Sequence, residues 1–204
     1  METIEFEVEI RETVTITSTE HETTILPFGP LDQFAVPYND VPGIWFYEEM
    51  LDYKQLQESL TRVVAHLPHL CGQLIWNENG TTDLIQNNKG IPFVFAFAPK
   101  VSINDFNIKT TSSSPKEFLK LTSRVKTDAT NPIVSIQLTQ FENGGCSLSV
   151  SGQHCVFDGA VLFNFFSLWS KEHRQASPQY LFELDNSILY KGTIFFLFFK
   201  KKEI

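Results

Sequence analysis

The sequence has little cysteine and no excess of basic residues, and each shortage excludes a class of protein. Only three cysteines occur among 204 residues (Cys71, Cys146 and Cys155), and none of them forms a Cys-x-x-Cys pair. Their odd number and wide spacing argue against a disulfide framework and against a zinc site, and they predict reduced thiols. The formal net charge is -8 and the pI is near 5.1, so no basic surface points to nucleic acid as a partner.

Several catalytic and targeting signatures are missing as well. No Gly-x-Ser-x-Gly elbow, Walker loop or His-Glu-x-x-His motif occurs, so serine nucleophiles, phosphoryl transfer and zinc proteolysis have no local signature. The acidic, alternating start, residues 1–10, lacks the basic and apolar regions of a signal peptide. The apolar run Ile194–Phe199 is far shorter than the roughly 20 residues of a membrane helix. We therefore expect a cytoplasmic protein without a transmembrane segment.

The composition is that of an ordinary folded domain with an unusual load of phenylalanine. Hydrophobic residues make up 42% of the chain and charged residues 20%, and the length suits one full domain. Nineteen phenylalanines predict either a very aromatic core or an apolar surface that meets another domain or subunit.

Hydrophobic periodicity predicts both strands and helices. Alternating or short apolar segments predict strands at 2–10, 41–49, 72–76, 82–86, 92–98, 134–138 and 148–150. Asn79-Gly80 and Asn143-Gly144 predict two hairpin turns, and the prolines and glycine of 25–32 predict an ordered loop. The pattern indicates an α/β fold, a two-layer mixed sheet with packed helices.

Three helices follow from capping signals and spacing. Asp52 and Gln55 form a capping box before a helix that Pro68 ends, and Ser114 and Glu117 form a second box before a helix through Val125. A third helix is predicted to start at Gly159, directly after Asp158 in the sequence. It is apolar nearly all round, so we expect it to be buried or to face another domain.

The segment around His154 combines a titratable side chain with a tight turn. If the strand before it stays regular, His154 lies on the same side as Leu148 and Val150 and points toward the covered face. Asp158 is placed to cap the helix that begins at Gly159. A neutral imidazole titrates near physiological pH and can take a proton from an alcohol or amine that attacks a carbonyl. We interpret His154 as a general base, although a satisfied core histidine explains the bare pattern equally well.

The residues around this turn also resemble a known family. Residues 153–169, with His154, Asp158 and Gly159, resemble the HxxxDG region of the plant-type BAHD acyltransferases, coenzyme A-dependent enzymes that esterify or amidate alcohols and amines. Residues 30–33, 56–74 and 90–94 are similar to upstream segments of that family. The agreement in order and spacing covers roughly residues 25–175, and only the HxxxDG part is a motif.

The resemblance implies a fold and roles for three residues. The fold would be the first half of a BAHD enzyme, which is chloramphenicol acetyltransferase-like. His154 would be the general base, Asp158 would point away from the substrate and hold the loop in shape, and Gly159 would leave room beside the reaction channel. Acyl-CoA would be a co-substrate, with no permanently bound cofactor and no metal. The residues that bind coenzyme A stay unassigned, because the family's donor site lies largely in its second half.

The chain departs from the family in length. Family members are longer, with two similar halves and the channel between them, and their second half carries a DFGWG motif that has no counterpart here. We predict an acyltransferase domain at 1–186 and an apolar, basic tail at 187–204. Three interpretations of the tail stay open: a strand or crossover that leads to a missing partner domain, a weak membrane-surface anchor assisted by its lysines, and the non-native end of a truncated chain, which we favour. Three alternatives stay open: an inactive fragment that only binds a partner, a self-associating trimer of the chloramphenicol acetyltransferase type, and a hydrolase.

Overall fold

The computed structural model describes residues 6–19, 22–38, 40–106, 118–126, 128, 130–175, 181–184 and 199–202. Its elements in chain order are β1 (Glu9–Ile16), β2 (Thr24–Pro27), α1 (Pro30–Ala35), β3 (Val41–Tyr47), α2 (Tyr53–His66), η1 (Pro68–Cys71), β4 (Gln73–Trp76), β5 (Thr82–Gln86), β6 (Ile91–Ala98), η2 (Ile103–Asp105), β7 (Val134–Phe141), β8 (Cys146–Gly152), α4 (Gly159–His173), β9 (Leu181–Leu184) and β10 (Phe199–Lys202).

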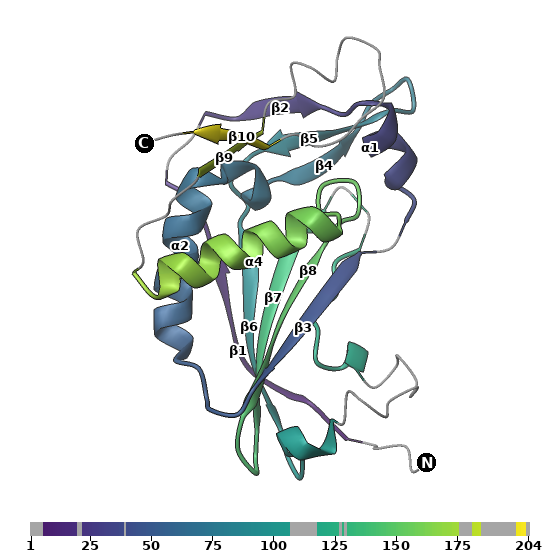
Figure 1. Ribbon diagram of the computed structural model, residues 1–204. Coiled ribbons are helices and arrows are strands. Elements are labelled where there is room, and N and C mark those ends of the chain that lie inside the picture. Colours follow the sequence, from purple (N-terminus) through teal and green to yellow (C-terminus); the bar gives the residue numbers. More distant parts are fainter. Residues whose placement is uncertain are drawn as a thin grey trace.

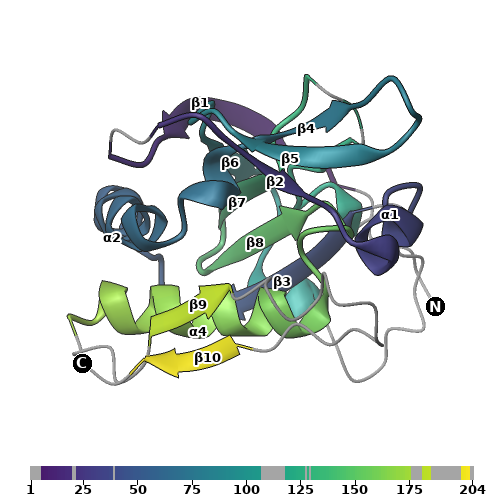
Figure 2. The ribbon, with the colours of Figure 1, turned by 90° about the horizontal axis from the view of Figure 1, so that it is seen from above.

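A five-stranded mixed sheet forms the centre of the fold, as Figure 1 shows. Its order is β1-β6-β7-β8-β3, with β6 and β7 parallel and the other pairs antiparallel. The helices α2 and α4 pack against one face of this sheet and enclose the larger apolar core (Figure 2). A second sheet, of order β2-β5-β4, completes the α/β architecture that the sequence predicts.

The hairpin of β7 and β8 is buried on both faces, and the two faces differ in chemistry. Its side chains toward the helices are apolar and belong to the larger core, among them Ile136, Leu148 and Val150. The alternate positions carry polar side chains, all buried: Ser135, Gln137, Thr139, Ser147, Ser149 and Ser151. Period-two alternation puts the two sets on opposite faces, with the larger apolar core on the helix side. A second, smaller apolar cluster joins Phe141, which shares the parity of the polar set on β7, to Phe6, Phe106 and Leu121.

Most of the predicted elements are confirmed. Asp52 caps α2, its Oδ1 accepting the Gln55 backbone N–H at 2.9 Å, and Pro68 follows the helix end as expected. The two Asn-Gly turns join antiparallel pairs, β4 with β5 and β7 with β8. Gly80 and Gly144 both have positive φ, the conformation for which glycine is favoured in such turns.

Two predictions near the N-terminus need correction. The strand predicted at 2–10 is present but begins later in the described residues, at Glu9, and it continues to Ile16. The predicted loop 25–32 instead contains β2 and the start of α1. Partners remote in sequence decide both, since β1 pairs with β6 and β2 pairs with β5. Pro30 sits in the first turn of α1, where its fixed φ suits a helix.

The helix predicted through Val125 ends earlier. Its start lies outside the described residues, Phe118 and Leu119 are helical, and the chain then turns. The backbone N–H groups of Leu121 and Thr122 donate to carbonyls three residues back, at 3.0 and 3.2 Å, the tightening expected at a helix end. Leu121 and Val125 are nevertheless buried, as their spacing predicts.

The C-terminal tail is described only in part. Residues 185–198, 203 and 204 lie outside the described residues, while β10 pairs antiparallel with β9. No helix in the described ranges is both long and apolar enough to cross a membrane. The division into a domain at 1–186 and a non-native tail at 187–204 therefore stays a prediction.

Candidate active site

His154 lies in a turn that Gln153 builds with its backbone. The Gln153 N–H donates to the Ile133 carbonyl at 2.9 Å, and its own carbonyl accepts the N–H groups of Val156 and Phe157 at 2.9 and 2.8 Å. The strand therefore becomes a turn at Gln153, with His154 at its outer corner.

The expectation that His154 points toward the covered face is wrong. His154 is exposed, whereas Cys155 and Phe157, which follow it, are buried. The expectation assumed that the strand stays regular as far as the histidine, but β8 ends at Gly152, two residues before it. The Phe157 ring packs on Gly152 so closely that a Cβ there would lie 2.4 Å from it, so the ring can fold back over the strand end only where glycine stands.

Asp158 and Gly159 hold the next helix in place. Oδ1 of Asp158 accepts the Val161 N–H at 2.8 Å, and its backbone carbonyl accepts the Leu162 N–H at 2.9 Å, which confirms the predicted N-cap of α4. A Cβ built on Gly159 meets no described atom within 4 Å. The space beside Gly159 is thus open, and the role expected for that space stays a prediction.

Asp158→Ala should lower the free energy of unfolding by about 1 kcal/mol, because Val161 loses its capping partner. His154→Ala should change it by less than about 0.5 kcal/mol, since His154 is exposed. Urea titration followed by circular dichroism measures both values. Asp158→Asn keeps a capping oxygen and serves as the control. A larger loss for His154→Ala than for Asp158→Ala would contradict the structural role of Asp158.

An ion pair with a buried carboxylate connects the segment around Arg124 to the start of β3 and to β8. The Asp40 carboxylate, 3% exposed, accepts Nε of Arg124 at 2.7 Å and also Nη2 of the same guanidinium. Ser151 on β8 donates its hydroxyl to the same carboxylate. The hydrogen bond to Asp40 raises the pKa of Arg124, so the guanidinium stays charged. No sequence motif marks these residues, and the sequence reasoning missed them.

The segment that carries Arg124 also holds Gln153. The Gln153 side-chain Nε2 donates to the Lys126 carbonyl at 2.7 Å, and its side chain is 1% exposed. The chain from Arg124 to Lys126 therefore contacts Asp40, just before β3, and Gln153, just after β8. These contacts hold the residue that precedes His154 in place.

An aromatic shelf, formed by Phe34 and Tyr38, lies beside the histidine. The ring centroids of Tyr38 and His154 are 6.0 Å apart, and those of Phe34 and Tyr38 are 5.5 Å apart. The two shelf residues are 65% and 49% exposed. A planar group that approaches His154 would meet exposed aromatic surface next to it.

The thiol of Cys155, next to His154, is not suited to act as a nucleophile. All three cysteines are free and buried, and burial raises the pKa of Cys155 to about 12. The Cys155 thiol therefore stays protonated near neutral pH and is a poor nucleophile. Burial also lowers the pKa of His69 to about 4, so this residue stays neutral within the fold. Within the described ranges, no three His, Cys, Asp or Glu side chains gather closely enough to hold a metal ion.

Comparison with known proteins identifies the family. The model of the Transferase family matches residues 6–192, which is most of the chain and includes the turn at His154. The chain belongs to this family. These are the BAHD acyltransferases, so the resemblance around the HxxxDG segment is confirmed at the level of the family.

Curated relatives in this family are longer than the chain. A hydroxycinnamoyltransferase from Narcissus pseudonarcissus is 28% identical over 142 residues, which cover 67% of this chain and 32% of the relative. A pelargonidin glucoside malonyltransferase from Salvia splendens is 32% identical over 145 residues, covering 69% of this chain and 32% of the relative. The chain thus spans about a third of the curated BAHD relatives it matches.

Solved structures show the same fold. Vinorine synthase aligns with a TM-score of 0.68 at 23% identity, covering 88% of this chain and 46% of that enzyme. TRI101 of F. sporotrichioides, solved with coenzyme A and T-2, aligns with a TM-score of 0.55 at 20% identity, covering 76% and 42%. The likeness confirms the BAHD-like and chloramphenicol acetyltransferase-like fold that the sequence predicts.

Proposed function

We propose that this chain is the part of an acyltransferase that carries the general base, and that the reaction moves an acyl group from coenzyme A to an alcohol or amine. The observation that carries the proposal is the exposed imidazole of His154, held between a rigid strand end and a capped helix. Membership of the BAHD family and the names of the relatives support this chemistry. TRI101, solved with coenzyme A, supports acyl-CoA as co-substrate.

The proposed step balances without a metal or a bound cofactor. The neutral His154 imidazole accepts the proton of the acceptor O–H or N–H as the acceptor atom attacks the thioester carbonyl. The tetrahedral intermediate then collapses, the C–S bond breaks, and the imidazolium returns the proton to the leaving thiolate. The products are the ester or amide and free coenzyme A. Asp158 acts through the backbone of α4 and does not touch the substrate.

The second wall of the site is also a proposal. The chain covers 46% of vinorine synthase and 32% of the hydroxycinnamoyltransferase from Narcissus, and His154 stands on an open surface. We infer that a second domain, or another copy of this chain, faces the histidine. The exposed rings of Phe34 and Phe163, at 65% and 67%, suit such a contact and also favour the alternative of an inactive chain that only binds a partner. The free cysteines support a cytoplasmic location.

Release of free coenzyme A distinguishes these functions. The purified 204-residue chain is mixed with acetyl-CoA, malonyl-CoA or p-coumaroyl-CoA and a panel of alcohols and amines, and free thiol is followed with a thiol reagent. A transferase should release thiol only when an acceptor is present, with the ester or amide detected by mass spectrometry. Release without an acceptor would identify a hydrolase. No release with any pair, from a chain that circular dichroism shows to be folded, would favour the partner-binding alternative.

A further inference from the structure

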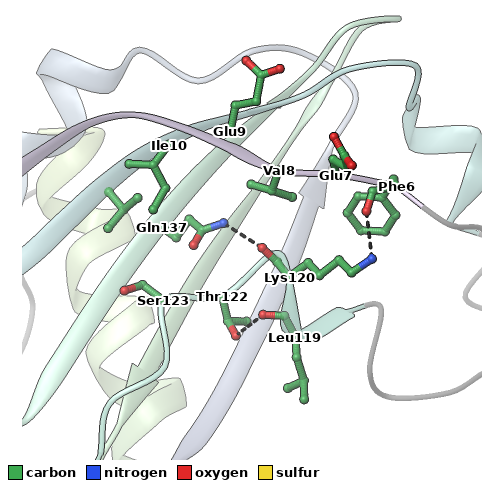
Figure 3. Close-up of a pocket in the computed structure, with 11 residues that line it drawn as sticks. Phe6, Glu7, Val8, Glu9, Ile10, Leu119, Lys120, Thr122, Ser123 and Gln137 are labelled. Atoms are coloured by element: carbon green, nitrogen blue, oxygen red, sulfur yellow. Dashed lines mark hydrogen bonds between the residues drawn. The ribbon is translucent and has the colours of Figure 1, made fainter.

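A cavity of about 530 Å³ opens on the sheet face opposite to α2 and α4 (Figure 3). Its floor is formed by Val94 on β6 and Gln137 on β7, whose neighbours Phe93 and Ile136 belong to the core on the helix side. Residues 6–10 form one wall, and residues 119–123 form the other. The volume falls within the range of about 300–1,000 Å³ that small-molecule sites occupy.

The floor of the cavity presents one fixed hydrogen-bond acceptor. Gln137 is 4% exposed, and its Nε2 donates to the Lys120 carbonyl at 3.1 Å and to Oγ1 of Thr139 at 2.9 Å. Because both amide hydrogens are used, the amide cannot flip, and its oxygen remains the acceptor. Oε1 accepts none of the hydrogen bonds found among the described residues, so it is open to a donor that enters the cavity.

The walls and the rim define the ligand further. Val8, Ile10 and Leu119 supply apolar surface, and Ile10 is 69% exposed at the edge. The exposed carboxylates of Glu7 and Glu9 lie on the same wall, and Glu9 is paired with Arg11 at 2.8 Å. Acceptors and carboxylates disfavour an anionic ligand and favour one that donates hydrogen bonds and carries positive charge.

Lys120, the cation among the described lining residues, does not reverse this preference. Nζ of Lys120 donates to the Phe6 carbonyl at 2.8 Å and lies 5.3 Å from the centre of the Phe6 ring. Its charge is thus engaged with the wall itself. Figure 3 shows the Lys120 side chain extended along Phe6, while Gln137 lies deeper between the two walls.

We propose that this cavity is a second binding site, for a compact amine with an aromatic or aliphatic body. The ammonium group donates to Oε1 of Gln137, and the body packs on Val8, Ile10 and Val94. The site lies across the sheet from the larger apolar core, does not include His154, and is independent of the proposed acyl transfer.

Three indole probes of similar size test the class of ligand, with no coenzyme A present. Tryptamine supplies a cationic donor, tryptophol a neutral donor, and indole-3-propionate an anion. Tryptamine should bind saturably with a Kd of about 1 mM or tighter, the range expected for a ligand of this size. It should bind at least about tenfold more tightly than indole-3-propionate, with tryptophol between them. Titration calorimetry and ¹⁵N chemical shifts of Gln137 and Val94 measure affinity and place.

A matched pair of variants tests the location. Ile10→Lys adds positive charge at the rim without removing a buried side chain, and should weaken tryptamine binding by about fivefold or more. Ile25→Lys makes the same change on β2, at an exposed residue away from the cavity, and should leave the Kd unchanged. Ser123→Phe is a second variant at the cavity, and it should also weaken tryptamine binding because the larger side chain fills the space.

Binding must also survive His154→Ala, which separates this site from the candidate active site. The proposal is overturned if no saturable binding occurs up to 10 mM, if the three probes bind equally, if Ile10→Lys and Ile25→Lys have the same effect, or if His154→Ala abolishes binding. Failure of acyl transfer by the unmodified chain would leave these expectations as they are, because none of the measurements depends on turnover.

Discussion

His154→Ala should lower the rate of acceptor-dependent thiol release by about 10²- to 10⁴-fold, the contribution that general bases commonly make. The loss should appear mainly in kcat, because the imidazole acts on the proton in transit and does not bind the acyl group. The fold should stay intact, since His154 is exposed and makes no hydrogen bond within the described part of the chain. Initial rates at saturating acyl-CoA, with and without the acceptor, measure the effect.

Two comparisons separate base catalysis from a general effect of losing a histidine. His66→Ala removes an exposed imidazole at the end of α2 and should leave the rate unchanged. Imidazole added to the buffer should restore part of the activity of His154→Ala, because the site is open to solvent. A rate within about threefold of the unmodified chain, with a normal melting profile, would sink the assignment of His154 as the base.

Arg124→Ala should lower the free energy of unfolding by about 3 kcal/mol, because it leaves the buried Asp40 carboxylate without its cation. The pair is unequally buried: the Asp40 side chain is 3% exposed and that of Arg124 is 34% exposed, so solvent offsets part of the loss. Ser151 would remain as a hydrogen-bond donor but cannot supply the missing charge. Chemical denaturation followed by circular dichroism gives the value.

A surface ion pair in the same chain serves as the control. Arg62 lies 3.5 Å from Glu172, joins α2 to α4, and has a side chain that is 48% exposed. Arg62→Ala should cost less than about 1 kcal/mol, as exposed pairs usually do. Arg124→Lys keeps the charge but loses the two-pronged contact, so its loss should fall between the two alanine variants. Equal losses for Arg124→Ala and Arg62→Ala would show that Asp40 does not depend on its partner.

Local signals predicted much of the fold. The cap of α2 at Asp52 and the cap of α4 at Asp158 each involve a side chain and a backbone N–H three residues on, so short patterns contain both partners. The two Asn-Gly hairpins depend on turn residues and on flanking alternation in the same way. The HxxxDG segment likewise lies within a few residues, which is why a single stretch of sequence indicated the family.

Local patterns of this kind could not predict contacts between segments that are distant in the sequence. β2 forms because it pairs with the edge of β5, which is remote in sequence. No residue pattern within 25–32 indicates that this pairing partner exists. The Asp40, Arg124 and Ser151 cluster joins residues separated by 84 and 111 positions. The direction of His154 failed for a related reason: the strand period was read two residues too far, because the packing of Phe157 on Gly152 ends β8 first.

The sequence alone therefore determined that this chain has caps, turns and alternating strands of an α/β domain, and that His154, Asp158 and Gly159 stand together as an acyltransferase-like motif. Only the tertiary structure decided that the histidine faces outward beside an aromatic shelf, that an ion pair with a buried carboxylate lies near the turn, and that a cavity lies on the sheet face away from α2 and α4. The physical reason is the separation along the sequence between the residues that interact. Capping and turn formation are completed within a few residues, whereas the exposure of a side chain, the burial of a charge and the shape of a cavity depend on segments that meet only when the whole sheet has formed.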